Sequence, residues 1–172
     1  RRIISDISFD MPVFLTGFQM DGVWTSGQTL LGTGVRLWLR SDNGGAPGDV
    51  ITELTTSNYA EATTGGSAFG RPIVRSDVSI SSGQVAAGTY WLERQIQGPE
   101  NYFQLTSFDA NNLLGEQTWV NYPDFGGIQP ADGIFGNQAE VNFKLFGEVV
   151  PTPGALALLG LAGLASRRRR RA

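Results

Sequence analysis

Two residue types that carry much of protein chemistry are missing, because the chain contains no cysteine and no histidine. Without cysteine, disulfides and thiolate chemistry are excluded. Without histidine, the usual imidazole base and the commonest metal ligand are also absent. Lysine occurs once, at Lys144, and charged residues make up only 17% of the chain. Any catalysis would therefore have to use paired carboxylates, a Ser–Lys arrangement or a metal held by oxygen ligands.

The charge is distributed unevenly between the end of the chain and the rest. The net charge is −3, but five arginines close the sequence. Without them the chain carries 8 basic and 16 acidic residues, a net charge of −8. An acidic body does not attract nucleic acid, so no nucleic-acid partner is expected. About 150 residues suffice for one domain with one core. We therefore expect a body over residues 1–148 and a separate segment over residues 149–172.

The body shows short alternating segments separated by Gly, Asn, Asp and Pro, with no sustained helical periodicity. In residues 35–40, Val35, Leu37 and Leu39 share one face, and Arg36, Trp38 and Arg40 share the other. The pattern predicts an all-β fold, a single antiparallel β-sandwich that is jelly-roll-like. Strands are expected over residues 3–9, 13–20, 35–40, 49–55, 72–80, 87–96, 102–108, 117–122 and 140–149. Loops are expected over residues 22–32 and 123–136, and a long loop or an irregular edge over residues 57–70.

Residues 41–48 (Ser-Asp-Asn-Gly-Gly-Ala-Pro-Gly) give the strongest turn signal in the chain. Asp42 and Asn43 are suited to cap the local backbone, and the two glycines that follow tolerate positive φ. Calcium binds carboxylate, amide and carbonyl oxygens on such loops, so Asp42, Asn43 and Asp49 are weak candidate ligands. The EF-hand spacing is absent, and capping is the favoured interpretation. No metal and no cofactor are predicted.

A catalytic constellation is not evident in the sequence. Lys144 lies on the outward face of a predicted strand, and no Ser-x-x-Lys motif occurs. A glycosidase would need two carboxyl groups facing one cleft, for which acids such as Glu93 and Asp109 are the available candidates. Most acidic residues are more simply explained as solvated loop residues. We therefore predict that the protein is not an enzyme and has no catalytic residues, with a carboxylate-based glycosidase as the less favoured alternative.

Aromatic residues suggest a second class of function, a secreted glycan-binding module that stacks sugars on exposed rings. Trp38 and Trp91 are predicted to pack in the interior, since tryptophan is usually buried at least in part. Trp119, Tyr122 and Phe125 lie near predicted loops and are the better candidates for a ligand-binding platform. An extracellular polysaccharide is the partner that they would bind.

The final residues of the chain combine a proline motif, an apolar run and a basic end. A helix over the twelve residues 154–165 would span roughly 18 Å, against about 30 Å for the hydrocarbon core of a bilayer. The run is therefore a short membrane segment, and the arginines would hold its end on the cytoplasmic side. Its residues include Ala155, Leu156, Leu158, Leu159, Leu161 and Leu164, and the basic stop is Arg167, Arg168, Arg169, Arg170 and Arg171.

This tail resembles the PEP-CTERM sorting signal of Gram-negative bacteria, in its V-P-x-P-G variant. Val150, Pro151, Pro153 and Gly154 match that motif, whereas Thr152 stands where the family name implies Glu. The resemblance implies recognition by an exosortase, a membrane-embedded cysteine transpeptidase that cuts near the proline motif. The precursor would then contact the inner membrane transiently and the body would reach the cell surface or extracellular matrix. A permanent C-terminal membrane anchor is the alternative.

Export would require a signal peptide, which we expect upstream of Arg1. The expected function is that of an exported surface or extracellular-matrix protein with a structural or adhesive role. Its predicted partners are the exosortase, the inner membrane and, for the matrix, extracellular polysaccharide.

Overall fold

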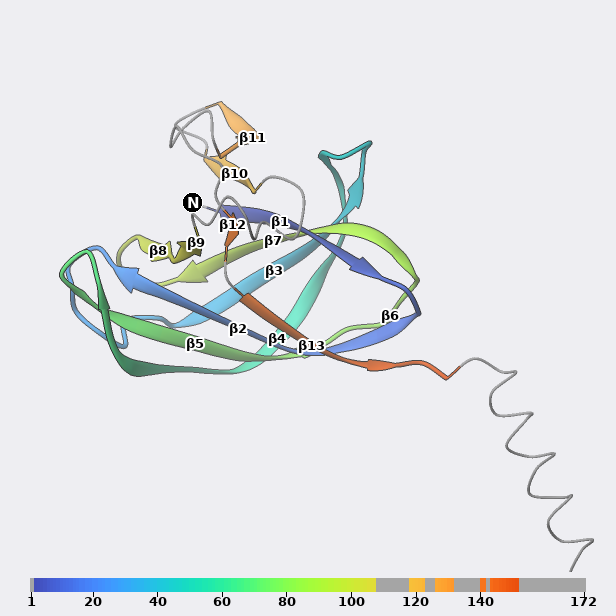
Figure 1. Ribbon diagram of the computed structural model, residues 1–172. Helices are drawn as coiled ribbons and strands as arrows, with labels where there is room; N and C mark the ends of the chain where they lie inside the picture. The colour runs from blue at the N-terminus through green and yellow to red at the C-terminus, as the bar shows by residue number, and fades with distance from the viewer. Residues whose placement is uncertain (1, 108–117, 123–125, 132–139, 142, 152–172) are drawn as a thin grey trace, which may run out of the picture.

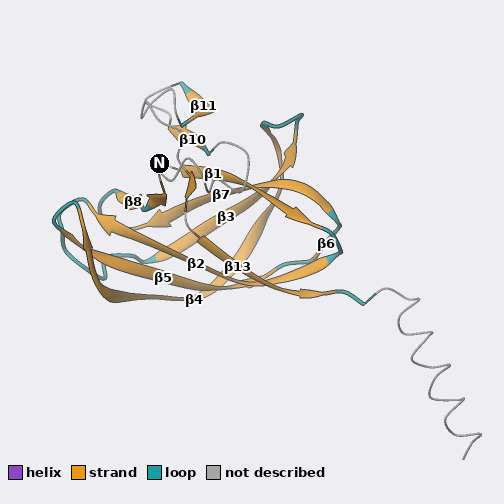
Figure 2. Ribbon diagram, viewed as in Figure 1, coloured by secondary structure: helices purple, strands orange, loops and turns teal. Residues whose placement is uncertain are grey.

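The computed structural model describes residues 2–107, 118–122, 126–131, 140–141 and 143–151. These residues form strands, turns and loops but no helix, as Figure 2 shows. All strand pairs in this part of the chain are antiparallel, which confirms the all-β prediction. The apolar helix predicted after residue 153 lies outside the described residues. The strands are β1 (Arg2–Phe9), β2 (Val13–Trp24), β3 (Gly34–Asp42), β4 (Pro47–Ala68), β5 (Arg71–Ser81), β6 (Gln84–Val85), β7 (Gly88–Gln97), β8 (Tyr102–Gln104), β9 (Thr106–Ser107), β10 (Trp119–Tyr122), β11 (Gly127–Pro130), β12 (Glu140–Val141) and β13 (Phe143–Val149).

One long strand, β4, joins the two halves of the strand network. The order of neighbouring strands is β11-β10-β1-β7-β3-β4-β5-β2-β13, with β6 and β8 also paired to β2, and β9 paired to β12. The first part of β4 pairs with β3, with Leu54 opposite Leu37. The second part pairs with β5, with Thr56 opposite Ile80. In Figure 1 the network folds over into two layers, with β1, β7 and β3 in one and β2, β5 and β13 in the other.

The main hydrophobic core lies between these two groups of strands. Alternating positions point inward from each strand, because successive side chains of a strand face opposite sides. Leu37 and Leu39 of β3 and Leu92 of β7 meet Phe18 and Met20 of β2. Val78 and Ile80 of β5, together with Leu15, Val35, Leu54 and Val85, complete the buried cluster. The inward face predicted for residues 35–40 is thus confirmed.

Residues 57–70 were predicted to form a long loop or an irregular edge, and the loop interpretation is wrong, because most of this segment is the second part of β4. The segment contains few apolar residues, and only Tyr59 among its larger side chains packs against the core. Backbone pairing with β5 holds it in place, with register shifts between Ser57 and Ala60 and between Thr63 and Ser67. Ladder hydrogen bonds need no apolar side chain, so hydrophobic periodicity could not detect this strand.

The loop predicted over residues 22–32 begins later than expected, because β2 continues through Trp24. The indole of Trp24 is fully buried and meets the ring of Tyr102 edge-on, with centroids 5.0 Å apart. A Cβ atom at Gly98 would lie 2.4 Å from the Trp24 ring, so only glycine fits there. The expected loop over residues 123–136 also contains a strand, β11, which pairs with β10.

Candidate functional site

The face of β3 and β7 that lies opposite their main-core face is largely buried. Trp38 and Arg40 on β3 and Trp91 and Glu93 on β7 all lie on this face, and Arg40 is only 9% exposed. Glu93 is completely buried. The prediction that both tryptophans pack in the interior is confirmed. Whatever buries the two tryptophans also buries Arg40 and Glu93, which lie beside them on this face. This shared burial sets the geometry of the site.

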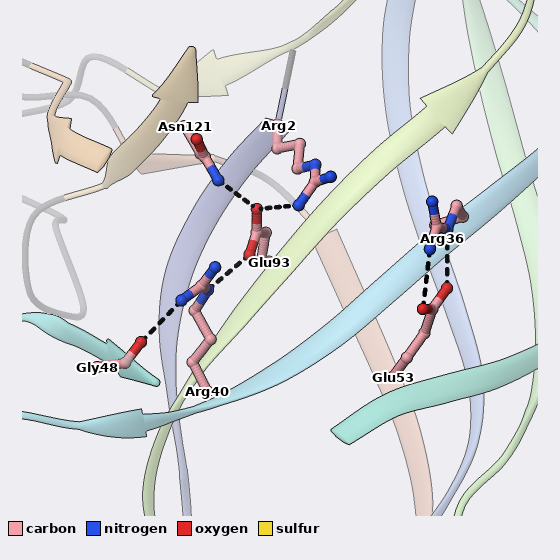
Figure 3. Close-up of polar contacts among 7 residues, drawn as sticks. All are labelled: Arg2, Arg36, Arg40, Gly48, Glu53, Glu93 and Asn121. Carbon is pink, nitrogen blue, oxygen red and sulfur yellow. Dashed lines mark hydrogen bonds and ion pairs between the residues drawn. The ribbon is translucent and has the colours of Figure 1, made fainter. Parts of the chain in front are cut away.

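Glu93 is the centre of a polar group, here named the Glu93 cluster, that also contains Arg2, Arg40 and Asn121 (Figure 3). Arg40 donates from Nε to Glu93 Oε2 at 2.5 Å. Arg2 donates from Nη1 to Oε1 at 3.1 Å, and Asn121 donates from Nδ2 to the same oxygen at 2.9 Å. Arg40 also donates from Nη1 to the carbonyl oxygen of Gly48 at 2.8 Å. Four strands, β1, β3, β7 and β10, therefore meet at one carboxylate.

The geometry of the Glu93 cluster favours a structural role for the carboxylate. Two cations and one amide donate to its two oxygens, and a buried charge needs such partners to offset its lost hydration. The guanidinium of Arg2 also lies over the ring of Trp38, 4.2 Å from the centroid, and that of Arg36 lies 4.7 Å from it. A general acid or base must reach its substrate, whereas this carboxylate has no exposed surface.

Arg94, the next residue along β7, points to the opposite side of the sheet and is also buried. It donates from Nε to Gln104 Oε1 at 2.7 Å, from Nη2 to Ser5 Oγ at 3.0 Å, and from Nη1 to the carbonyl oxygen of Leu92 at 3.2 Å. Its guanidinium lies 4.6 Å from the centroid of the Phe143 ring. Burial lowers the pKa of the Arg94 guanidinium well below its ordinary value. Among the described residues no carboxylate forms an ion pair with it.

The described surface includes three hollows that bear on a candidate site. The first, about 440 Å³, lies along the loop of residues 95–102 and is lined by mostly polar groups. The second, about 320 Å³, has Leu39, Leu54 and Val85 among its lining residues. The third, about 20 Å³, lies beside Arg94 and Tyr102 and offers space for a single water-sized molecule. Only the second combines a buried apolar floor with an exposed rim.

The candidate calcium ligands are placed around the β3–β4 turn, where one of them already has partners. Asp42 accepts hydrogen bonds through Oδ1 from the backbone N–H of Gly45 at 3.2 Å and from Trp91 Nε1 at 2.8 Å. The backbone N–H of Asn43 donates to the carbonyl oxygen of Ala46, and Asp49 is exposed. Gly45 has a φ of 88°. Within the described residues, no three acidic side chains gather in a way that could hold a metal ion.

The candidate glycan-binding aromatics do not form a common exposed surface among the described residues. Tyr122 is 7% exposed and packs with Val120 and Ala131. Trp119 is half-buried and meets Trp91 edge-on, with centroids 6.3 Å apart. Phe125 lies outside the described residues. Tyr122 is therefore not an exposed platform, whereas Trp119 keeps part of its surface open to solvent.

The two acids considered for a glycosidase cannot be compared directly, because Asp109 lies outside the described residues. Glu93 belongs to the Glu93 cluster and faces no hollow among those described. Lys144 is exposed on β13, as its position in the alternation predicts. One feature of the sequence could have indicated the Glu93 cluster: Trp38 and Trp91 share the strand faces of Arg40 and Glu93, and two tryptophans on one face indicate that the face is covered.

The predicted sorting signal begins at the end of β13. The backbone N–H of Val150 donates to the carbonyl oxygen of Pro12 at 2.9 Å, and Pro151 is exposed. Thr152, Pro153 and Gly154, the apolar run and the arginine cluster lie outside the described residues. In the part of the chain that is described, we find no helix with the length and apolar character needed to cross a membrane.

Comparison of the chain with models of protein families, with curated proteins and with solved structures finds no match.

Proposed function

We propose that this chain is an exported surface or extracellular-matrix protein with a structural or adhesive role, and that an exosortase processes its tail. The observation that carries the proposal is the order of three parts at the end of the chain: Val-Pro-Thr-Pro-Gly, a short apolar run and five arginines. An apolar run backed by arginines is held in a membrane with its basic end on the cytoplasmic side. The precursor would therefore contact the inner membrane only until the tail is cut.

The place where the tail joins the body supports this proposal. The last strand of the body, β13, ends at Val149, and the proline motif begins at the next residue. Pro151 is exposed, so an enzyme acting there would not have to open the core. The proposed division is thus a body over residues 1–148 and a sorting segment over residues 149–172.

The arrangement of the body also fits a structural protein. We propose that residues 1–148 form one β-sandwich, jelly-roll-like, whose two layers share β4. The main core draws residues from both groups of strands, which supports two packed layers. The buried charged groups are held by partners of their own chain, and we propose no catalytic role for them.

Mass spectrometry of the mature protein's C-terminus tests the proposal. The full-length chain would be expressed, with a signal peptide, in a Gram-negative host that carries an exosortase. We expect a mature C-terminus near Pro151 to Gly154 and loss of all five arginines. A variant with Pro151 and Pro153 both replaced by Ala serves as the matched control and should keep the tail. A mature protein that retains Arg167 to Arg171 in the membrane would instead establish the permanent anchor.

A further inference from the structure

Exposed apolar side chains gather at the end of the body where β13 ends. Phe14, at the start of β2, is 42% exposed, and Phe146 and Val149 of β13 are 47% and 51% exposed. Met11, in the turn between β1 and β2, is 49% exposed. These four residues are here named the apolar tip. Apolar side chains that are exposed together mark a contact with a protein or with a membrane.

The pairing of β2 with β13 brings the side chains of the tip together. Val149 lies opposite Val13, the residue before Phe14. Phe146 lies opposite Gly17, and a Cβ atom there would be 3.3 Å from the Phe146 ring. The ring therefore lies over the bare backbone of β2. Because paired strands fix the tip, the body presents it without any rearrangement.

The apolar run of the tail follows the tip closely in the chain. The backbone N–H of Val150 donates to the carbonyl oxygen of Pro12 at 2.9 Å, which fixes the end of β13 to the β1–β2 turn. Only residues 150–153 separate β13 from the apolar run over residues 154–165. Even fully extended, this linker reaches less than about 20 Å. Once the run has entered a membrane, the tip lies within that distance of it.

The shortness of the apolar run brings the tip closer still. A helix over residues 154–165 would span roughly 18 Å, against about 30 Å for the hydrocarbon core. A membrane accommodates so short a segment by thinning, or the residues that flank the segment are drawn into its polar surface layer. On the body side this flank begins directly after β13, so the tip reaches the lipid headgroups.

Charges beside the tip decide which kind of surface it suits. Asp10 precedes Met11 in the chain, and Glu148 lies opposite Phe14. Both acidic residues are exposed. Anionic lipids attract basic segments and repel carboxylates, and a second copy of this acidic body would be repelled as well. A zwitterionic lipid surface therefore suits the tip best.

We propose that the apolar tip docks on the lipid headgroups of the membrane that holds the tail, and so keeps the body against the bilayer where the tail is cut. The contact rests on the proposed function, because it needs a tail in the membrane. A single weak signal binds a membrane reversibly, and stable anchoring takes two. The tail supplies the second signal, so cutting the tail also releases the tip.

The test places the full chain in phosphatidylcholine vesicles whose acyl chains carry bromine, which quenches nearby fluorophores. Because the chain has no cysteine, Thr16→Cys takes a label beside the tip, and Thr64→Cys takes one near the β4–β5 turn. Both threonines are exposed, and Figure 1 shows this turn at the end of the body opposite to the end of β13. Docked apolar side chains reach the boundary of headgroups and acyl chains, so the Thr16 label should be quenched at least about twofold more than the Thr64 label.

A double variant, Phe14→Ser with Phe146→Ser, separates docking from simple tethering. The tail alone keeps the label at position 16 near the membrane, but docking is needed to bring it to the acyl chains. Quenching in this variant should therefore fall to the level of the distant label. Met11→Ser changes a residue outside the strands, so it leaves the ladder intact and should give a partial loss. Unchanged quenching in both variants would overturn the proposal.

Leu30→Ser with Phe69→Ser is the matched control. It also removes two exposed apolar side chains, from the β2–β3 loop and the β4–β5 turn at the opposite end of the body. Quenching of the Thr16 label should stay at the wild-type level. A loss equal to that of the double variant at the tip would also overturn the proposal, because it would indicate general surface stickiness.

Flotation of the vesicles reads tail insertion separately from docking. A wild-type chain that floats with the vesicles but is quenched equally at both labels would refute docking and leave the proposed tail intact. A chain that does not float would refute the membrane segment itself. In a host with an exosortase, the double variant at the tip should also lose its arginines more slowly. Slower cutting without any quenching by pure lipid would assign the tip to the exosortase and overturn the lipid contact.

Discussion

Two Arg–Glu pairs extend from the same strand and face the same side of it, yet their surroundings differ. Arg36 on β3 binds Glu53 on β4 through two hydrogen bonds of 2.8 and 2.9 Å, and both side chains are close to half exposed. Arg40, four residues along, binds Glu93 on β7 with both side chains buried. Figure 3 shows the two pairs side by side.

The comparison shows that an Arg–Glu pair affects stability differently when it is exposed to water and when it is buried in the protein. Water and salt screen the exposed pair, so such pairs contribute little to stability. The buried pair has exchanged hydration for protein partners, so removing one member leaves a charge without compensation. Arg2 and Asn121, which also bind Glu93, make the buried pair the point where distant strands meet.

Glu93→Gln should have the largest effect. The change keeps the size of the side chain but removes the charge that offsets Arg40 and Arg2. We expect a loss of about 3–5 kcal/mol in the free energy of unfolding, as for other broken buried pairs. Urea denaturation followed by tryptophan fluorescence measures it. Glu53→Gln, the matched control on the exposed pair, should shift the midpoint far less, and equal shifts would contradict the distinction.

Arg40→Met, added to Glu93→Gln, should recover part of that loss. Once the carboxylate is gone, the buried guanidinium of Arg40 is the unfavourable group, and an apolar side chain of similar length removes it. Coupling between residues in direct contact amounts to about 0.5–3 kcal/mol, and we expect a value in the upper half of this range. A double-mutant cycle in urea measures the coupling. Strictly additive losses would show that Glu93 and Arg40 do not act as a unit.

Arg94→Met should have a smaller effect than Glu93→Gln. Gln104 and Ser5 would each lose a hydrogen bond from a charged donor, and such a bond contributes about 1.5–3 kcal/mol. Relief from burying a guanidinium offsets part of this cost. We therefore expect a net loss of about 1 kcal/mol, measured by the same denaturation. A loss as large as that of Glu93→Gln would indicate that Arg94 has an anionic partner.

The contribution of the exposed Arg36–Glu53 pair to stability should be detected mainly through its dependence on pH. The hydrogen bond from Arg36 lowers the pKa of Glu53 below its ordinary value of 4.5. A carboxyl with a lowered pKa in the folded state stabilises the protein above its unfolded pKa, and loses this contribution as pH falls through the folded pKa. The difference in thermal midpoint between wild type and Glu53→Gln should therefore be constant near neutral pH, begin to shrink near the ordinary pKa of 4.5 and disappear once the pH has fallen through the lower pKa of the folded state. A difference that persists in strong acid would exclude the ion pair as its cause.

The sequence predicted those parts of the fold that depend on side-chain alternation. Residues 35–40 and 72–80 lie within observed strands, and residues 87–96 do so apart from Ala87, which precedes β7. Alternation did not predict the second part of β4. That segment consists mainly of Thr, Ser, Ala and Gly, so its apolar side chains do not repeat at every second residue, and backbone pairing alone defines the strand. Turn chemistry was informative at Asp42, which caps Gly45, but not at Phe69, where a hairpin turn contains an unfavourable residue.

The candidate site was harder to predict, because alternation says which residues share a face but not what covers that face. Trp38 and Arg40 were correctly placed on one side of their strand and Trp38 was predicted to pack in the interior, but alternation did not indicate that Arg40 is buried beside it. Burial of Glu93 depends on Arg2 and Asn121, which are remote in sequence and reach it only after β1 and β10 have paired. Such a cluster follows from tertiary contacts and leaves little local signal.

The order in which the strands pair has a consequence for a chain that crosses a membrane from its N-terminus. β3, β4 and β5 are consecutive neighbours, so this central meander closes with short loops. β1 instead needs β7 and β10, and β2 needs β13 as its outer neighbour. If the body emerges from the membrane in chain order, its first strands therefore lack some of their neighbours until β13 has emerged. Since β13 directly precedes the proline motif, completion of folding would coincide with the arrival of the tail at the bilayer.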